Sequence, residues 1–469
     1  MTIRHRSGQP AATDRIARTS GWRAVTATLI RFEAWLPALC GAVWWVVFYP
    51  GFFGEDSLIN LNEVRSGTIT VWFTAWWIYV VDFLTLGTRA IPLLTLVTVL
   101  TLQYALYLWA VTCFPAGAVR TFAVLSIAAS PLVGAIGVQL RHDASMTAGL
   151  LLCTVAITRT WPPILRWGPQ PFLLLVIAAP LVATRHNGVP TLLGAAGLCV
   201  LLFGWAQWRQ AAALAAVAAA AMAITVGATR ASGNVDSIDP VQTVEWLMAD
   251  ISCLLTKDGI EASPDESAVL GRIASTEDWP HQRACVFMNP IFVAPTFRPD
   301  AIRSNYGPLL RVWLSLGARY PAEMVAVHLV RVRAFVPPLI TGLPSNELMP
   351  FIHSTILPND FGLEWAFPTL ATWVRPVVRA WNALRFLLAN VALWLMVLCI
   401  AAWKWPVRRR ALVPAIVIGL SLELGLLVTA PISEGRYGLF ILACGQLTGL
   451  FLVLEAVGAS RRSSTCRPM

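Results

Sequence analysis

Charged residues are scarce in this chain of 469 residues. Only 13% of the residues are Asp, Glu, Lys or Arg, whereas 57% are hydrophobic. Soluble domains carry about 25% charged residues, so the composition excludes an ordinary soluble domain and indicates a polytopic membrane protein. Many of the 21 tryptophans stand near the ends of apolar runs, as interfacial anchors do.

Several motifs that would identify a function are also missing. The sequence has no phosphate-binding P-loop, no glycine-rich dinucleotide motif, no zinc-protease motif and no nucleophile elbow. Its nine cysteines lack the C-x-x-C spacing of metal or redox sites. No cleavable signal peptide is expected, because the first apolar run begins only at residue 34. The net charge of +10 lies in short clusters between apolar runs, which indicates orientation in a bilayer and no nucleic-acid partner.

The apolar runs predict about ten transmembrane helices. Arginines before the first run place the N-terminus in the cytoplasm, and ten crossings return the C-terminus there. The short run 70–86, which contains Asp82, is expected to lie on the outer interface, because a span there would turn the later basic clusters outward. The expected spans are 34–49, 90–113, 119–139, 144–158, 171–184, 189–206, 210–228, 386–403, 411–430 and 436–457.

This count predicts a multi-pass plasma-membrane protein with one long extracytoplasmic segment. The polar part of that segment, 230–320, shows a helical pattern from Val241 to Leu255 and an N-cap at Ser263. Cys253 and Cys285 stand alone in it, either as a disulfide, which an oxidising compartment permits, or as two free thiols. The predicted units are a basic cytoplasmic tail (1–33), an N-terminal transmembrane module (34–228), an extracytoplasmic and interfacial segment (229–385), C-terminal transmembrane helices (386–457) and a cytoplasmic tail (458–469).

Four polar clusters fall on the outer face in this topology. A charged residue at a span end is usually a solvated helix cap, so each cluster taken alone can be explained without a functional role. The three arginines of these clusters, however, lie on the outer side, where the positive-inside rule disfavours basic residues. Arginine binds phosphate through a planar fork of donors, so one cleft built from these clusters suits an anionic, lipid-linked substrate. The clusters are Glu55-Asp56, Arg141-His142-Asp143, Arg185-His186-Asn187 and Glu434-Gly435-Arg436-Tyr437.

Other polar residues leave alternatives open. His142, Asp143 and His186, together with Asp56, offer a mixed nitrogen and oxygen set for a divalent metal, more suited to Zn or Mn than to Mg. His328 and Arg331 share one face of an amphipathic helix, which either lies among lipid headgroups or contacts a lipid phosphate. The sequence leaves the roles of Asp82 and Glu423 open, although both stand inside apolar stretches.

The four clusters, in this order and topology, resemble motifs of the GT-C superfamily of membrane glycosyltransferases. An acidic motif directly after the first span is the hallmark of that family, and the stretch 49–57 is similar to the Y-P-G-x-x-x-x-D-S variant of bacterial members. Arg141-His142-Asp143 resembles their basic-x-Asp motif, Arg185-His186-Asn187-Gly188 their R-x-N-G motif, and Ser433-Glu434-Gly435-Arg436-Tyr437 a late E-x-R-Y motif.

The resemblance implies a GT-C-like fold and transfer of a sugar from a polyprenyl-phosphate donor to a glycan, lipid or protein acceptor of the cell envelope. Asp56 would be the general base, Glu55 its neighbour, and Asp143 a second acid for acceptor or metal. Arg185 and Arg436 would hold the donor phosphate, with Arg141 as a further candidate. The chain departs from many members in two ways: run 70–86 has no histidine, and no large C-terminal carbohydrate-binding domain follows.

Two other functions compete with this interpretation. A transporter or flippase of a charged envelope lipid would use ionisable residues at membrane depth, although such proteins usually place them mid-span and show internal repeats, which are not visible here. A scaffold within an envelope complex would leave the outward arginines unexplained.

Overall fold

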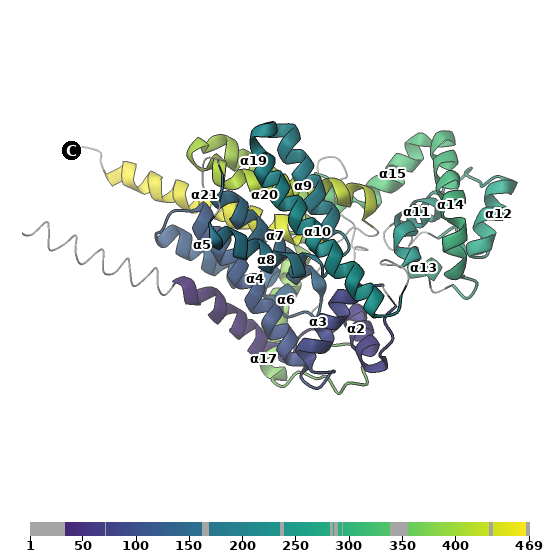
Figure 1. The fold of residues 1–469 in the computed structure, drawn as a ribbon, viewed down its shortest axis with the longest axis horizontal. Coiled ribbons are helices and arrows are strands. Elements are labelled where there is room, and N and C mark those ends of the chain that lie inside the picture. The colour runs from purple at the N-terminus through teal and green to yellow at the C-terminus, as the bar shows by residue number, and fades with distance from the viewer. Residues whose placement is uncertain are drawn as a thin grey trace, which may run out of the picture.

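The computed structural model describes most of the chain as helix. It describes residues 33–70, 72–161, 168–234, 239–281, 285, 289–292, 294–337, 355–430 and 435–465. These residues contain no β-strand, only the isolated bridges Phe52–Gln139 and Phe53–Ile356. Figure 1 shows a large helical bundle with a smaller helical lobe at one side. The all-α prediction is therefore confirmed for the described residues, and the predicted tail before Glu33 lies outside them.

The bundle packs around one continuous apolar core. Helix α7 is buried on nearly all sides, as expected for an apolar helix at the centre of a bundle, and it packs against α4 and α8. The helices of the bundle are Glu33–Val47, α4 (Ile91–Cys113), α5 (Ala118–Ala128), α6 (Pro131–Gly137), α7 (His142–Arg159), α8 (Pro169–Val182), α9 (Gly188–Phe203), η1 (Trp205–Gln207), α10 (Trp208–Ala231), α19 (Val391–Lys404), α20 (Pro406–Thr429), η5 (Gly435–Gly438) and α21 (Leu439–Thr465).

Four described helices are long and apolar enough to cross a membrane. They are Ile91–Cys113, Trp205–Ala231, Arg408–Thr429 and Arg436–Val457, and the bent pair α5 and α6 makes a fifth candidate. The chain is therefore a helical membrane protein, whereas the count of ten spans stays a prediction. Run 70–86 forms the short helix α3 (Ala75–Thr85), which at 1.5 Å per residue is about half the thickness of a hydrocarbon core.

Two segments far apart in sequence pack together after the first helix. Helix α2 (Glu55–Ser66) follows the first loop and packs against α3. The backbone of Phe53 hydrogen-bonds to residues 355 and 357, and Ala366 N–H donates to the carbonyl of Tyr49 at 3.0 Å. The last part of the predicted segment 229–385, with η4 (Arg333–Phe335), α17 (Pro368–Ala383) and α18 (Arg385–Leu388), thus lies against the bundle and not in the lobe.

The lobe has its own apolar core, formed by helices between residues 240 and 331. Its first helix matches the predicted pattern from Val241, and Ser263 caps the next helix with Glu266 in a capping box, as its position in the sequence predicts. Figure 1 shows these helices grouped away from the bundle. They are α11 (Pro240–Leu254), α12 (Pro264–Ile273), η2 (Thr276–Asp278), α13 (Asn289–Phe292), α14 (Asp300–Arg319) and α15 (Pro321–Arg331).

Cys253 and Cys285 form a disulfide within the lobe, with their Cα atoms 4.7 Å apart. The two free thiols of the alternative hypothesis are therefore excluded. The bond closes a loop with a sequence separation of 32 residues.

We expect Cys253→Ala to lower the free energy of unfolding of the lobe by about 2–4 kcal/mol, because the bond restricts the unfolded chain. Denaturation of the purified protein, read by proteolysis of the lobe, measures this loss. Cys399→Ala, which removes a free and exposed cysteine, is the control. Equal stability of the Cys253→Ala variant and the wild type would contradict the expectation.

Candidate active site

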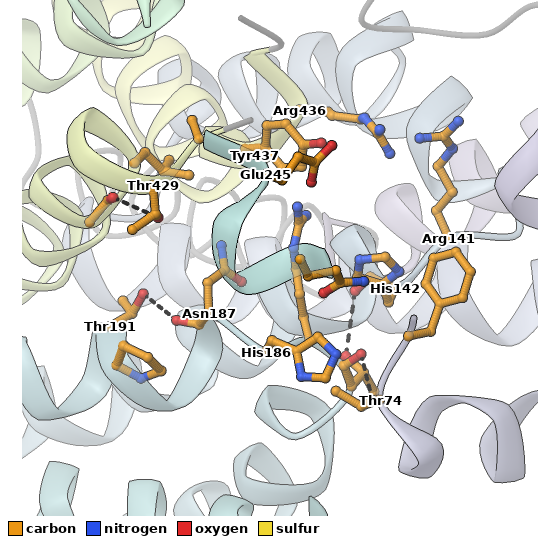
Figure 2. A pocket seen from close by; sticks show the side chains of 18 of the residues that line it. Thr74, Arg141, His142, His186, Asn187, Thr191, Glu245, Thr429, Arg436 and Tyr437 are labelled. Atoms are coloured by element: carbon orange, nitrogen blue, oxygen red, sulfur yellow. Dashed lines mark hydrogen bonds between the residues drawn. The ribbon is translucent and has the colours of Figure 1, made fainter. Parts of the chain in front are cut away.

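The predicted clusters line one cavity of about 540 Å³. Its volume lies in the range of sites that bind small molecules. Figure 2 shows how residues from α11, η5 and the starts of α7 and α9 surround it. All three predicted arginines are in its wall, as are the acids of the first cluster. The predicted residues in the wall are Glu55, Asp56, Arg141, His142, Arg185, His186, Asn187, Arg436 and Tyr437. Glu434 lies outside the described residues.

The loop before α2 places Asp56 beside Arg141. Phe52 N–H donates to the carbonyl of Val138 at 3.1 Å, and Ser57 Oγ donates to the carbonyl of Leu140 at 3.1 Å. Gly51 has φ +140°, and a Cβ there would stand 2.6 Å from the carbonyl oxygen of Val138. This close approach explains why a glycine follows the proline in the motif.

The turn between α8 and α9 presents Arg185, His186 and Asn187. Thr184 at the end of α8 accepts a hydrogen bond on its carbonyl from Thr74 Oγ1, at 3.0 Å, which ties this turn to the start of α3. A Cβ on Gly188 would stand 2.5 Å from the carbonyl oxygen of Val182. The glycine of the R-x-N-G motif therefore permits the tight passage from α8 into α9.

Ion pairs join the three arginines to two aspartates. Asp56 Oδ2 lies 3.0 Å from Arg141 Nη1 and 3.5 Å from Arg436 Nη1. Asp143 pairs with Arg185 and lies 3.3 Å from Arg436. Arg436 thus pairs with both carboxylates, and the ring of Tyr437 lies against Arg185 at 4.3 Å and against Arg436 at 5.0 Å. The arrangement fixes three guanidinium groups around the cavity.

Asp143 and Asp56 have different surroundings in the structure. Its side chain is 1% exposed and does not line the cavity, whereas that of Asp56 is 30% exposed and does. Asp143 lies behind Arg185 and Arg436 and holds them in place. In this arrangement Asp143 is buried and its carboxylate is paired with two guanidinium groups, so it positions these arginines.

The expected metal set does not assemble. Among the described residues, no group of three or more His, Cys, Asp and Glu side chains is placed to hold a metal ion. Asp143, the carboxylate of that set, is occupied by Arg185 and Arg436, and positive groups there oppose a cation. His142, Asp143 and His186 therefore do not fit the hypothesis of a divalent metal cofactor.

Glu245 is a wall residue that the sequence motifs miss. It comes from α11 of the lobe, together with Gln242 and Thr243, and Figure 2 shows it among the side chains of the cavity. Burial raises the pKa of the Glu245 carboxyl to about 8; the charge of Arg331 opposes this rise and that of Asp56 adds to it. A signal was present in the sequence, because Glu245 stands four residues after Val241 and three before Met248 on the apolar stripe of its helix.

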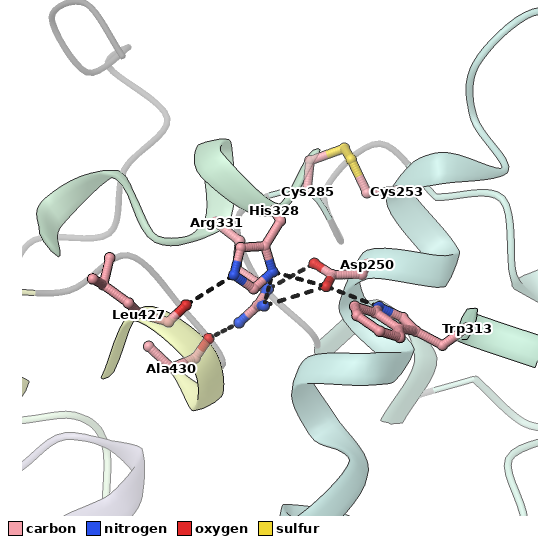
Figure 3. A network of polar contacts seen from close by, with 8 residues as sticks. All are labelled: Asp250, Cys253, Cys285, Trp313, His328, Arg331, Leu427 and Ala430. Atoms are coloured by element: carbon pink, nitrogen blue, oxygen red, sulfur yellow. Dashed lines mark hydrogen bonds and ion pairs between the residues drawn. A yellow bond between two sulfur atoms is a disulfide. The ribbon is translucent and has the colours of Figure 1, made fainter. Parts of the chain in front are cut away.

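His328 and Arg331 do share a helical face, as the sequence predicts, but they bind another part of the protein and not lipid. Figure 3 shows both side chains converging on Asp250 of α11. Arg331 Nε donates to Asp250 Oδ1 at 2.9 Å, and a ring nitrogen of His328 lies 3.0 Å from Asp250 Oδ2. The other ends of these side chains reach the carbonyls of Ala430 and Leu427. This network, which we call the latch, joins the lobe to α20 beside the cavity.

Asp82 and Glu423, whose roles the sequence leaves open, are not among the residues that line the cavity. Asp82 is exposed on α3. Glu423 is 5% exposed inside the candidate span of α20, and neither of its carboxyl oxygens has a hydrogen-bond partner among the residues that the structure describes.

No known protein family, curated protein or solved structure matches this chain.

Proposed function

We propose that this protein is an integral membrane glycosyltransferase that transfers a sugar from a polyprenyl-phosphate donor to a cell-envelope acceptor. One observation carries the proposal: four motif clusters from distant parts of the chain form one cavity, with a partly exposed carboxylate beside three arginines. A carboxylate serves as a base toward an acceptor hydroxyl, and arginines neutralise a leaving phosphate.

In the proposed reaction, the carboxylate of Asp56 takes the proton of the acceptor hydroxyl. The acceptor oxygen attacks the anomeric carbon while the bond from that carbon to the phosphate oxygen breaks. The polyprenyl phosphate leaves with the bonding electrons, and Arg436, Arg185 and Arg141 neutralise its charge. The displacement is a single step, so it inverts the anomeric configuration.

The position of the cavity along α20 supports a lipid-linked donor. Its wall includes Ser421, Leu422, Gly425, Leu426 and Thr429, the last of which ends the helix. At 1.5 Å per residue, the wall follows this candidate span for about 12 Å. A phosphate at the arginines would therefore have its chain beside a membrane helix.

Helix directions support an extracytoplasmic cavity, with both termini of the chain in the cytoplasm. Helices α7 and α9 begin at the cavity, and α20 ends there. At the opposite ends, Arg159 is the last residue of α7, the run 408–410 lies in the first turns of α20, and Arg209 follows α9 at the start of α10. Because basic residues favour the cytoplasmic side, the cavity would open on the other side.

Arg436→Gln is expected to reduce transfer by about 100-fold, the loss typical when one donor to a developing oxyanion is removed. The assay measures glycosidic bond formation by the full-length protein in vesicles that contain a polyprenyl-phosphate sugar and a glycan acceptor. Arg311→Gln, at an exposed position of α14, is the matched control. Transfer by Arg436→Gln at the wild-type rate would refute the role of Arg436, and a wild type that never transfers sugar would refute the proposed function.

A flippase is the second candidate, favoured by Glu423. A buried carboxyl group without a hydrogen-bond partner inside a membrane span often marks a transport pathway. A flippase would move the lipid-linked sugar across vesicles and form no glycosidic bond, so the same vesicle assay separates the two functions.

A further inference from the structure

The lobe contributes three described residues to the cavity wall, and Glu245 is the acidic one among them. Helix α11 is fixed on both sides of Glu245. Before it, the Gln242 side chain donates to the carbonyl of Trp72, another wall residue. After it, Asp250 is held by the latch. Glu245 therefore has a defined place in the wall, because its helix cannot shift without breaking one of these contacts.

Among the described residues, the charges around Glu245 balance one another when Glu245 itself is not counted. The arginines of the wall, Arg141, Arg185 and Arg436, face the carboxylates of Glu55 and Asp56 and the buried carboxylate of Asp143. The wall also contains His142 and His186, and Arg331 acts on Glu245 from the lobe. If Glu245 is neutral, the three arginines of the described wall stand against three carboxylates, because Arg331 is itself paired with Asp250. If it is ionised, the described wall has an excess of negative charge, which disfavours an anion.

We propose that Glu245 is a further binding residue of this cavity: as a neutral carboxyl it donates a hydrogen bond to the phosphate of the substrate, and as a carboxylate it repels that phosphate. The inference rests on the proposed function, because it takes the phosphate-linked donor as the ligand. The raised pKa of Glu245, about 8, keeps the carboxyl neutral at pH 7. A neutral carboxyl has one O–H donor, which the carboxylate lacks.

The test measures binding of a polyprenyl phosphate to the full-length protein in nanodiscs of zwitterionic lipid, from pH 6.5 to pH 9. Only the neutral fraction binds, so wild-type affinity should fall about tenfold by pH 9. Glu245→Gln keeps a donor and has no charge, so it should show only the pH dependence that ionisation of the phosphate itself causes, without the further tenfold fall. Glu261→Gln, the same substitution at an exposed site of the lobe, should behave as the wild type.

A second variant separates the hydrogen bond from the charge. Glu245→Ala is neutral but has no donor, so it should follow the pH dependence of Glu245→Gln and bind about tenfold more weakly. Two probes identify the group that is recognised. Inorganic phosphate should compete with the same pH-dependent difference between the wild type and Glu245→Gln, and the polyprenol without phosphate should not show that difference.

Three results would overturn the inference alone: a pH-dependent fall in Glu245→Gln equal to that of the wild type, loss of binding by Glu245→Gln at pH 7, or the same pH dependence with the polyprenol. A wild type that binds neither polyprenyl phosphate nor inorganic phosphate at any pH would overturn the proposed function as well. The two failures are therefore distinguishable.

Thermal unfolding gives a second readout that needs no ligand. A carboxyl whose pKa rises from 4.5 to about 8 on folding binds its proton more tightly in the folded state. Its stabilising contribution is complete below pH 4.5 and is lost as the pH rises through 8. The Tm of the wild type should therefore fall relative to that of Glu245→Gln between pH 6 and pH 9, and a constant difference would contradict a neutral Glu245.

Discussion

Asp56→Asn is expected to lower glycosyl transfer by about 10²–10⁴-fold, the range of a general base. Asparagine has nearly the same shape but cannot accept the proton of an acceptor hydroxyl. Asp56 is the one to test because its side chain is 30% exposed in the cavity, whereas Asp143 is buried at 1%. Initial rates of sugar transfer in vesicles, at saturating donor, measure the effect.

The control for this variant is Asp360→Asn, at an exposed position outside the cavity wall, which should transfer at the wild-type rate. Binding of polyprenyl phosphate should persist in Asp56→Asn, because the three arginines remain. Retained transfer in Asp56→Asn would refute the role of base. A misfolded variant is recognised by an altered elution volume in gel filtration, and Asp56→Glu then tests the role with the carboxylate kept.

Asp250→Ala is expected to destabilise the protein by about 3–5 kcal/mol, because it leaves the charge of Arg331 buried without a partner. Arg331 is 1% exposed, and two of its nitrogens donate to Asp250, at 2.9 and 3.3 Å. Trp313 Nε1 also donates to Asp250, at 3.1 Å. The midpoint of unfolding in denaturant, followed by proteolysis of the lobe, measures this loss.

Two comparisons show that the buried charge is the cause. Asp360→Ala breaks only an exposed contact with Arg65, so it should cost less than about 1 kcal/mol. Asp250→Leu combined with Arg331→Met removes both charges and should recover most of the stability. A double variant as unstable as Asp250→Ala would show that the lost hydrogen bonds, and not the charge, explain the effect.

The latch also predicts how its stability changes with acid. Burial alone would raise the pKa of Asp250, but the hydrogen bond from His328 and the charge and hydrogen bond of Arg331 outweigh it and lower that pKa below 3.8. A lowered carboxyl pKa gives stability that is present above the ordinary value and is lost as the pH falls through the folded value. The latch should therefore hold at neutral pH and weaken only in strong acid.

Much of the candidate site could be predicted from local patterns. Polar clusters at the ends of apolar runs indicated Asp56, Arg141, Arg185 and Arg436, and the structure brings them to one cavity. Local patterns did not give the partners of these residues. The contact between Arg436 and Asp143 joins positions 293 residues apart, so only tertiary packing, in which η5 lies against α20 and α21, brings the two side chains together. The burial of Asp143 among arginines, and the failure of the expected metal set to assemble among the described residues, could not be predicted from the sequence for this reason.

Two acids of the lobe show the same limit of prediction from the sequence. Glu245 and Asp250 both lie among the apolar positions of α11, so the sequence indicated that they face the protein, but not which residues they contact. One faces the cavity, and the other faces Arg331. The orientation of α11 determines which of these groups each acid contacts, and contacts between residues far apart in the sequence set that orientation.

The sequence by itself determined that this is a helical membrane protein, because burying so many apolar side chains with so few charges requires a bilayer. It also placed the polar clusters at the ends of apolar runs, because a helix rises a fixed distance per residue and the runs set the spacing between the clusters. Only the tertiary structure decided that Asp56 is accessible, that Asp143 is a buried partner of arginines, and that Glu245 enters from the lobe. Those outcomes depend on contacts between residues far apart in the chain, and hydrophobic periodicity carries no information about them.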